Sequence, residues 1–187
     1  MRIHSHGTGK PFQTGITVLE LMITLTIAAI LFSASLPAYQ QFTLKQRMKA
    51  AVTALHNDLL MARSEAVLRG NLVVICPGSP LEGCRGSNDW SSGWIVFPDH
   101  NGDRQRQQDE TILRHGQGIE RVNILSSIHR RDIRFFPGGS TPGANGTISL
   151  CGFGGPENAR KLVISNIGRI RRDIYPGINP SLCPKQM

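Results

Sequence analysis

The fold is decided by residues 15–36, GITVLELMITLTIAAILFSASL, where Glu20 is the only charged residue. The apolar run, residues 16–36, would extend roughly 30 Å as a helix at about 1.5 Å per residue, which is the thickness of the apolar core of a bilayer. The sequence therefore predicts a membrane-spanning helix over residues 16–36.

The segment before this run, residues 1–15, is polar and weakly basic and ends in Gly15. In an ordinary secretory signal peptide the small-residue cleavage site follows the apolar segment, whereas here a small residue precedes it. Cleavage after Gly15 would remove residues 1–15 as a leader and leave a free amine on Ile16. Because a carboxylate in a membrane span costs about 3 kcal/mol or more, we expect Glu20 to pair with this amine, in its own chain or a neighbouring one.

Residues 15–21, GITVLEL, resemble the prepilin peptidase motif of type IV pilins and type II secretion pseudopilins. The resemblance implies that a prepilin peptidase cleaves after Gly15 and methylates Ile16, and that Glu20 assists docking into a growing filament. It also implies a single-pass protein of the bacterial inner membrane, with its head in the periplasm before assembly into a pilus at the cell surface. Ile16 departs from the usual Phe or Met. The alternative is a plain transmembrane anchor with an incidental glutamate.

Residues 37–69 are predicted to continue the same helix as an amphipathic second half. Apolar residues recur there every three or four positions, which is the spacing of one buried helix face. Pro37 is expected to kink the helix or remove a hydrogen bond, and Gly70 is a natural terminator. The predicted stripe consists of Leu44, Met48, Val52, Leu55, Leu59, Ala62 and Ala66.

Residues 70–187 form a predicted β-rich head, because short apolar runs alternate there with Gly, Pro and Asn. The runs lie at residues 72–75, 94–97, 111–113, 122–125, 133–136, 147–150, 161–164 and 169–174. This spacing favours antiparallel sheets over alternating strands and helices. We expect an α+β fold, with a long N-terminal helix packed on a head of two antiparallel β-sheets.

Two further segments narrow the resemblance. ARSEA, residues 62–66, closes the predicted helix, and SGWIVF, residues 92–97, precedes Asp99 and Asn101. Together they resemble the FimT/GspH family, which contains minor pilins of type IV pili and minor pseudopilins of type II secretion systems. The resemblance implies the type IV pilin fold and makes other pilins of the filament the expected partners.

The four cysteines are Cys76, Cys84, Cys151 and Cys183. Their spacing is not that of a zinc site or a CxxC redox pair, and an even number in an exported chain favours two disulfides. Proximity in sequence favours Cys76–Cys84 and Cys151–Cys183, although four cysteines allow three connectivities.

The sequence indicates no catalytic frame, no cofactor and no metal site. The nearest candidate is the acidic segment 99–110, where Asp99, Asn101, Asp103 and Glu110 have the spacing of EF-hand ligands. However, Arg104 stands where the sharp turn of an EF-hand requires Gly, and the flanking residues are predicted strands rather than helices. A solvated hairpin turn is the preferred interpretation.

The basic residues are a stronger candidate for binding. The chain has 21 Lys and Arg against 13 Asp and Glu, and residues 160–172 contain five basic residues without an acid. On an extended segment Arg169 and Arg171 would point to one face, where two guanidinium groups could engage successive phosphates. A solvated edge strand protected by charge fits the same residues equally well.

The family favours the phosphate interpretation. Some FimT-like minor pilins bind extracellular DNA through a Gly-Arg-x-Arg motif in the C-terminal region, which residues 168–171, GRIR, match. The predicted DNA-binding residues are Arg160, Lys161, Gly168, Arg169, Arg171 and Arg172. The resemblance thus implies a minor pilin that binds DNA without sequence preference and aids its uptake in natural transformation. The alternative is a minor pseudopilin of a type II secretion system with no role in DNA binding.

The cleavage site can be tested directly. Gly15→Ala is expected to block or slow maturation, because the peptidase must accommodate the scissile residue, and Glu20→Ala should be cleaved normally but enter filaments poorly. Both are measured from the size of the chain on a gel and from its recovery in sheared filaments. Unchanged maturation of Gly15→Ala would contradict the prepilin interpretation.

Overall fold

The computed structural model describes residues 15–143, 145–152 and 159–174. A single long helix, α1 (Val18–Arg69), precedes all of the described strands. The strands are β1 (Val73–Ser79), β2 (Gly83–Cys84), β3 (Gly93–Pro98), β4 (Arg114–Gln117), β5 (Val122–Ser126), β6 (Ile133–Phe135), β7 (Gly146–Gly152), β8 (Arg160–Ile164) and β9 (Ile170–Ile174). Contacts divide the chain into two compact units, with the boundary between Gln41 and Phe42 within α1.

The first turn of α1 carries its own cap. The Thr17 hydroxyl accepts the backbone N–H of Glu20 at 3.2 Å, which is the N-cap arrangement of a Thr-x-x-Glu sequence. Glu20 therefore lies in the first turn, where the helix dipole favours a negative charge. The helix begins at Val18, two residues later than predicted, and it continues through Pro37.

The part of α1 in the first unit carries exposed apolar side chains from Val18 to Tyr39. Its hydroxyl groups bond back to the helix, as when Thr26 donates to the carbonyl of Met22 at 2.7 Å. Among the described residues, no helix is long and apolar enough to cross a membrane, contrary to the span predicted for residues 16–36. The apolar side chains of that segment are interrupted by the Glu20 carboxylate and by hydroxyl groups such as that of Thr26.

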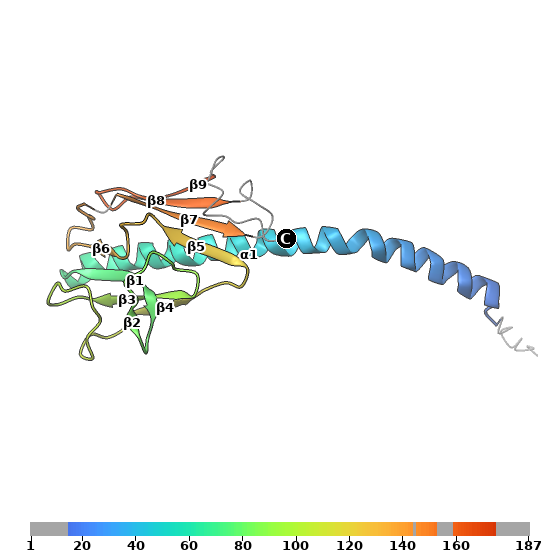
Figure 1. The fold of residues 1–187 in the computed structure, drawn as a ribbon, viewed down its shortest axis with the longest axis horizontal. Helices are drawn as coiled ribbons and strands as arrows, with labels where there is room; N and C mark the ends of the chain where they lie inside the picture. The colour runs from blue at the N-terminus through green and yellow to red at the C-terminus, as the bar shows by residue number, and fades with distance from the viewer. Residues whose placement is uncertain (1–14, 144, 153–158, 175–187) are drawn as a thin grey trace, which may run out of the picture. The chain divides into compact units, whose positions relative to one another are not determined.

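In the second unit, α1 buries the predicted stripe except at its N-terminal end, where Leu44 is only half-buried. The six other predicted residues are buried, and Ala51 joins them: Met48, Val52, Leu55, Leu59, Ala62 and Ala66. These side chains share one core with residues of both sheets, which lie along this part of α1 in Figure 1. Gly70 ends the helix with a φ of 62°, a left-handed conformation that glycine adopts without strain, as predicted.

The described strands form two antiparallel sheets, which confirms the predicted α+β architecture. The first sheet has the order β2-β1-β3-β4, with β6 paired to β1, and the second has the order β5-β7-β8-β9. Strands β1 and β3 are buried on both faces. One face contributes Val73 and Ile75 to the main core, and the other forms a second cluster of Val74, Cys76, Ile95 and Phe97.

The β1–β2 hairpin contains the first disulfide. Cys76 and Cys84 are bonded, as predicted, and β1 continues through Pro77 and Gly78, beyond the run predicted at residues 72–75. A Cβ atom on Gly78 would lie 1.9 Å from the carbonyl oxygen of Gly83, so only glycine permits this close pairing. Cys151 is also disulfide-bonded, and its predicted partner, Cys183, lies outside the described residues.

The predicted strand at residues 111–113 is also displaced. The fourth strand is Arg114–Gln117, whose residues are exposed except at Gly116. A Cβ atom on Gly116 would lie 2.1 Å from the ring of Trp94, so the strand packs through a glycine rather than through apolar side chains. Strand β4 therefore forms without a run of apolar residues.

A buried carboxylate ties α1 to the first sheet. Asp58 Oδ2 accepts the indole N–H of Trp94 at 2.8 Å, and its Oδ1 accepts the Nε–H of Arg114 at 3.1 Å. The Arg114 side chain is 61% exposed, so solvent screens the ionic part of this contact. The buried bond to Trp94 is therefore the stronger constraint on how the helix packs against β3.

This bond predicts a difference between two substitutions. Asp58→Ala leaves the indole N–H of Trp94 buried without an acceptor, which should lower the free energy of unfolding by about 2–4 kcal/mol. Asp58→Asn retains an acceptor oxygen and should lose clearly less. Urea unfolding of the full chain measures both values. Equal losses in the two variants would show that the hydrogen bond from Trp94 to Asp58 does not stabilise the fold.

Candidate nucleic-acid interface

The predicted DNA-binding residues lie on the β8–β9 hairpin. The strands pair with Ile164 opposite Ile170 and Val163 opposite Arg171. Beyond the pairing, Ser165 N–H donates to the carbonyl of Arg169 at 3.0 Å, and Gly168 N–H donates to the carbonyl of Ser165 at 2.8 Å. Gly168 has a φ of 75°, so the chain closes with a β-turn followed by a left-handed glycine, a common three-residue hairpin loop.

Gly168 has a second reason to be glycine. A Cβ atom on it would lie 1.9 Å from the carbonyl oxygen of Gly139 and 3.1 Å from Nε of Arg63. That same carbonyl accepts the Nε–H of Arg63, from α1, at 2.9 Å. Thr141 adds two bonds, from its N–H to the carbonyl of Asn166 at 2.8 Å and from its hydroxyl to the carbonyl of Ser165 at 2.7 Å. The turn is thereby fixed to the β6–β7 connection and to α1.

A second contact brings Arg130 to the same turn. Asn166 N–H donates to Oδ1 of Asn145 at 2.8 Å, and Asn145 N–H donates to Oδ1 of Asn166 at 3.1 Å. The carbonyl of Asn145 in turn accepts the Nε–H of Arg130 at 3.1 Å. We call residues 165–169 together with Arg63, Arg130 and Arg171 the basic turn. Its four arginines come from three segments of the chain, namely α1, the β5–β6 connection and the β8–β9 hairpin.

The structure does not gather all six predicted residues on one face. Leu162 and Ile164 point into the core, so Lys161 points outward, as does Arg171 opposite Val163. Arg160 falls on the core side of β8, and Arg172, opposite Leu162, falls on that side too. Of the six predicted residues, Arg171 and Lys161 lie on the outward side of the hairpin, and Arg169 is on the same side by alternation from Arg171.

The contacts of these residues differ as well. Lys161 pairs with Asp173 across the hairpin at 3.6 Å, and Arg160 donates to the carbonyl of Ala159 at 2.9 Å. Arg172 lies 2.9 Å from Nδ1 of His56 on α1. The pKa of His56 is lowered mainly by partial burial of the ring and to a smaller extent by the positive charge of the nearby Arg172 guanidinium. Arg172 thus contacts the helix, on the opposite side of β9 from Arg171.

The four arginines of the basic turn share one electrostatic property. Within residues 15–143, 145–152 and 159–174, none of Arg63, Arg130, Arg169 and Arg171 forms an ion pair with a carboxylate, although several other arginines do. Arg169 and Arg171 are exposed. Guanidinium groups held on a fixed backbone without carboxylate partners are suited to bind phosphate. Sequence reasoning missed Arg63 altogether, because a contact between residues 63 and 139 leaves no local pattern.

The residues of the predicted processing site lie at the other end of the described chain. Gly15, Ile16 and Glu20 are all exposed, and a Cβ atom on Gly15 would have no described atom within 4 Å. The described residues therefore leave the backbone at Gly15 accessible to an enzyme. The predicted leader lies, apart from Gly15, outside the described residues.

The buried carboxylates of the acidic segment 99–110 accept hydrogen bonds from the backbone of the same segment. Asp99 and Glu110 are buried, with Asp99 accepting the N–H groups of Gly102 and Arg104 at 2.7 and 3.0 Å. Glu110 accepts those of His100 and Gln107 at 2.9 and 3.0 Å. These carboxylates stabilise the loop itself, and the described residues contain no group of three that could hold a metal ion.

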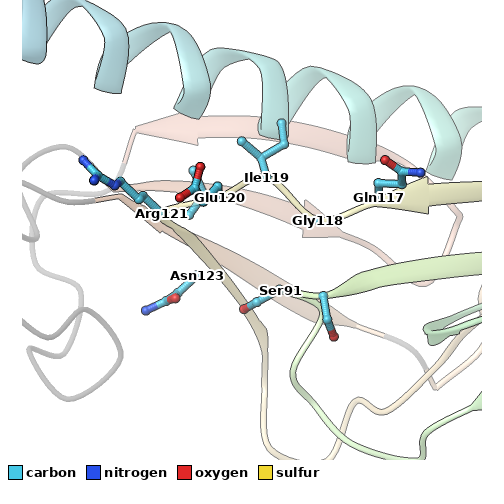
Figure 2. A pocket seen from close by; sticks show the side chains of 9 residues that line it. Ser91, Gln117, Gly118, Ile119, Glu120, Arg121 and Asn123 are labelled. Atoms are coloured by element: carbon cyan, nitrogen blue, oxygen red, sulfur yellow. The ribbon is translucent and has the colours of Figure 1, made fainter.

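A groove of about 500 Å³ is lined by residues 91–92 and by residues 117–123, which run from the end of β4 into the start of β5. Figure 2 shows Ile119 directed toward α1, with Ser91 and Asn123 lying away from the helix. Ser91 Oγ accepts the N–H of Ile124 at 2.9 Å, and Glu120 lies 3.9 Å from Arg47. The groove shares no residue with the basic turn.

Comparison with known proteins identifies the family. The family model described as "Type II transport protein GspH" matches residues 51–168. The chain belongs to the GspH family. The matched segment of this GspH-family chain runs from the buried stripe of α1 to Gly168 and ends immediately before Arg169.

Solved structures agree on the fold. Two crystal forms of the type IV minor pilin FimU of Pseudomonas aeruginosa strain PAO1 are 24% identical to this GspH-family chain, with TM-scores of 0.54 and 0.56. They cover 67% and 72% of this chain and 91% and 92% of their own. The minor pseudopilin EpsH of Vibrio cholerae is 11% identical, with a TM-score of 0.49 and coverage of 68% and 97%, a likeness too weak to bear on the fold. The chain has the type IV pilin fold.

The contact at Gly168 predicts a matched pair of substitutions. Gly168→Ala introduces both a left-handed alanine and a clash with the Gly139 carbonyl, and should lower the free energy of unfolding by about 2–4 kcal/mol. Gly143 has a φ of 69°, and a Cβ atom on it would have no described atom within 4 Å, so Gly143→Ala should cost only about 1 kcal/mol. Thermal unfolding of the two variants measures both losses of stability. Equal losses of stability would mean that the contact with Gly139 does not constrain the turn.

Proposed function

We propose that this GspH-family chain is a minor pilin of a type IV pilus that binds extracellular DNA and aids its uptake in natural transformation. The observation that carries the proposal is the basic turn. Its exposed arginines, Arg169 and Arg171, follow the left-handed Gly168 of a Gly-Arg-x-Arg sequence and have no carboxylate partner among the described residues.

The chemistry of the turn favours phosphate over base contacts. A guanidinium group donates two parallel hydrogen bonds to a phosphate, whereas reading bases requires side chains placed along a groove. Arg130 and Arg63 are each held beside the turn through Nε, and their remaining guanidinium N–H groups would add phosphate contacts. Binding through phosphates has little sequence preference and weakens steeply with salt, which suits the capture of unrelated DNA.

We also propose that the chain matures as a prepilin. A prepilin peptidase would cleave after Gly15 and methylate Ile16, and Glu20 would assist docking among other pilins. The exposed apolar side chains of α1 in the first unit support this proposal, because such a surface needs neighbouring apolar surface to cover it. The partners would be the other major and minor pilins of the filament.

The second candidate is a minor pseudopilin of a type II secretion system. The description of the matching family favours it, and so does the end of the match at Gly168, which leaves Arg169 and Arg171 outside. In that case the arginines would serve as charged protection of β9, which is one of the two edge strands of the second sheet as described. DNA binding separates the two candidates.

The test replaces both arginines by Gln in the purified full chain. About three to four phosphate contacts should give a log–log salt slope near −3, and Arg169→Gln with Arg171→Gln should flatten it by about two units. Affinity for duplex DNA should fall sharply while the thermal midpoint is unchanged, because both side chains are exposed.

The matched control is Lys45→Gln with Lys49→Gln, which removes the same charge from α1. It should leave binding nearly unchanged. An equal loss in the control would indicate diffuse attraction to a chain of net charge +8 rather than a site. If the arginine variant binds DNA like the parent, the pseudopilin becomes the better account.

A further inference from the structure

The basic turn carries an apolar side chain where turns usually carry polar ones. Ile167 is 70% exposed, between Asn166 and Gly168. Turn positions favour Asn, Asp, Ser and Gly, since these residues are solvated and bond to the nearby backbone. Ile170, three residues later, packs against the core, whereas Ile167 does not. The apolar surface of Ile167 is therefore available to a ligand.

The backbone on both sides of Ile167 is fixed. Asn166 makes the paired bonds with Asn145 and accepts the N–H of Thr141, and Gly168 donates to Ser165. These bonds hold Ile167 at the tip of the hairpin, two residues from Arg169. Proteins that enter the minor groove of DNA use a similar arrangement, in which an apolar wedge inserts between base pairs and arginines lie beside it.

We infer, on the basis of the proposed function, that the basic turn binds double-stranded DNA from the minor groove, with Ile167 as a wedge between base pairs. Arg169 and the flanking arginines then contact the phosphates and the groove wall. A narrow minor groove in A·T-rich DNA has an enhanced negative potential that attracts arginine. Single-stranded DNA is ordinarily bound by stacking bases on aromatic side chains, and residues 165–169 contain none. Duplex DNA is therefore the ligand that the turn fits.

This mode has consequences that phosphate contact alone lacks. Insertion of Ile167 unstacks one base step and bends the duplex, so flexible steps in A·T-rich DNA should bind more tightly than G·C-rich DNA. The preference should be modest because no side chain of the turn reads a base by a paired hydrogen bond. A ligand that fills the minor groove should compete with the protein.

The experiment compares the purified full chain with Ile167→Ala on a duplex that carries 2-aminopurine at its centre. Ile167→Ala should weaken duplex binding about tenfold, the effect of removing a branched apolar contact, and should abolish the fluorescence increase that reports unstacking. The salt slope should stay unchanged because no charge is lost. Leu81→Ala is the matched control, since Leu81 is 98% exposed in the β1–β2 hairpin, and it should change nothing.

A competition assay provides the second readout. Netropsin, which fills the minor groove, should displace the parent protein, whereas methyl green, which occupies the major groove, should not. If Ile167→Ala binds and unstacks like the parent, or netropsin does not compete, the minor-groove inference is wrong while binding by Arg169 and Arg171 stands. If the parent does not bind duplex DNA, both the inference and the proposed function fail.

Discussion

The structure of the second unit depends on burying one face of α1 against both sheets at once. Leu55, Leu59, Ala62 and Ala66 have no exposed surface, and all four share the core with residues of both sheets. The same stretch of helix supplies Asp58 to Trp94 and Arg63 to Gly139. The helix therefore fixes both the first sheet and the basic turn, because apolar packing places its polar side chains within hydrogen-bond distance of distant loops.

The alternation of side chains along β8 and β9 divides the basic residues of the hairpin between its two faces. Residues that alternate along β8 and β9 point to opposite faces, so five neighbouring basic residues do not form one patch. Lys161 is paired with Asp173, and Arg172 lies beside His56 on the helix side. Arg169 and Arg171 are exposed on the outer side, where Arg130 joins through Asn145. Specific contacts, rather than net charge, define the candidate site.

The sequence predicted those features that have a local periodicity. The buried stripe of α1 and most strands follow from apolar spacing, and the end of the helix follows from the glycine at position 70. The short Cys76–Cys84 separation favoured the correct bond. Strand β4 was missed because RHGQ packs through Gly116 against a tryptophan and has no apolar run. The placement of Arg172 was predictable in principle, since it is an odd number of residues from Arg169 and Arg171. The approach of Arg63 and Arg130 depends on contacts between distant residues and had no local signal.

The central claim, that the basic turn is the surface that contacts DNA, is tested most directly by nuclear magnetic resonance. The measurement is the change in backbone amide shifts of the ¹⁵N-labelled full chain on titration with a short DNA duplex. The largest changes are predicted at residues 165–171 and at Asn145 and Arg130, while the groove at residues 117–123 should be unaffected. Changes centred on that groove, or spread evenly over exposed lysines and arginines, would contradict the claim.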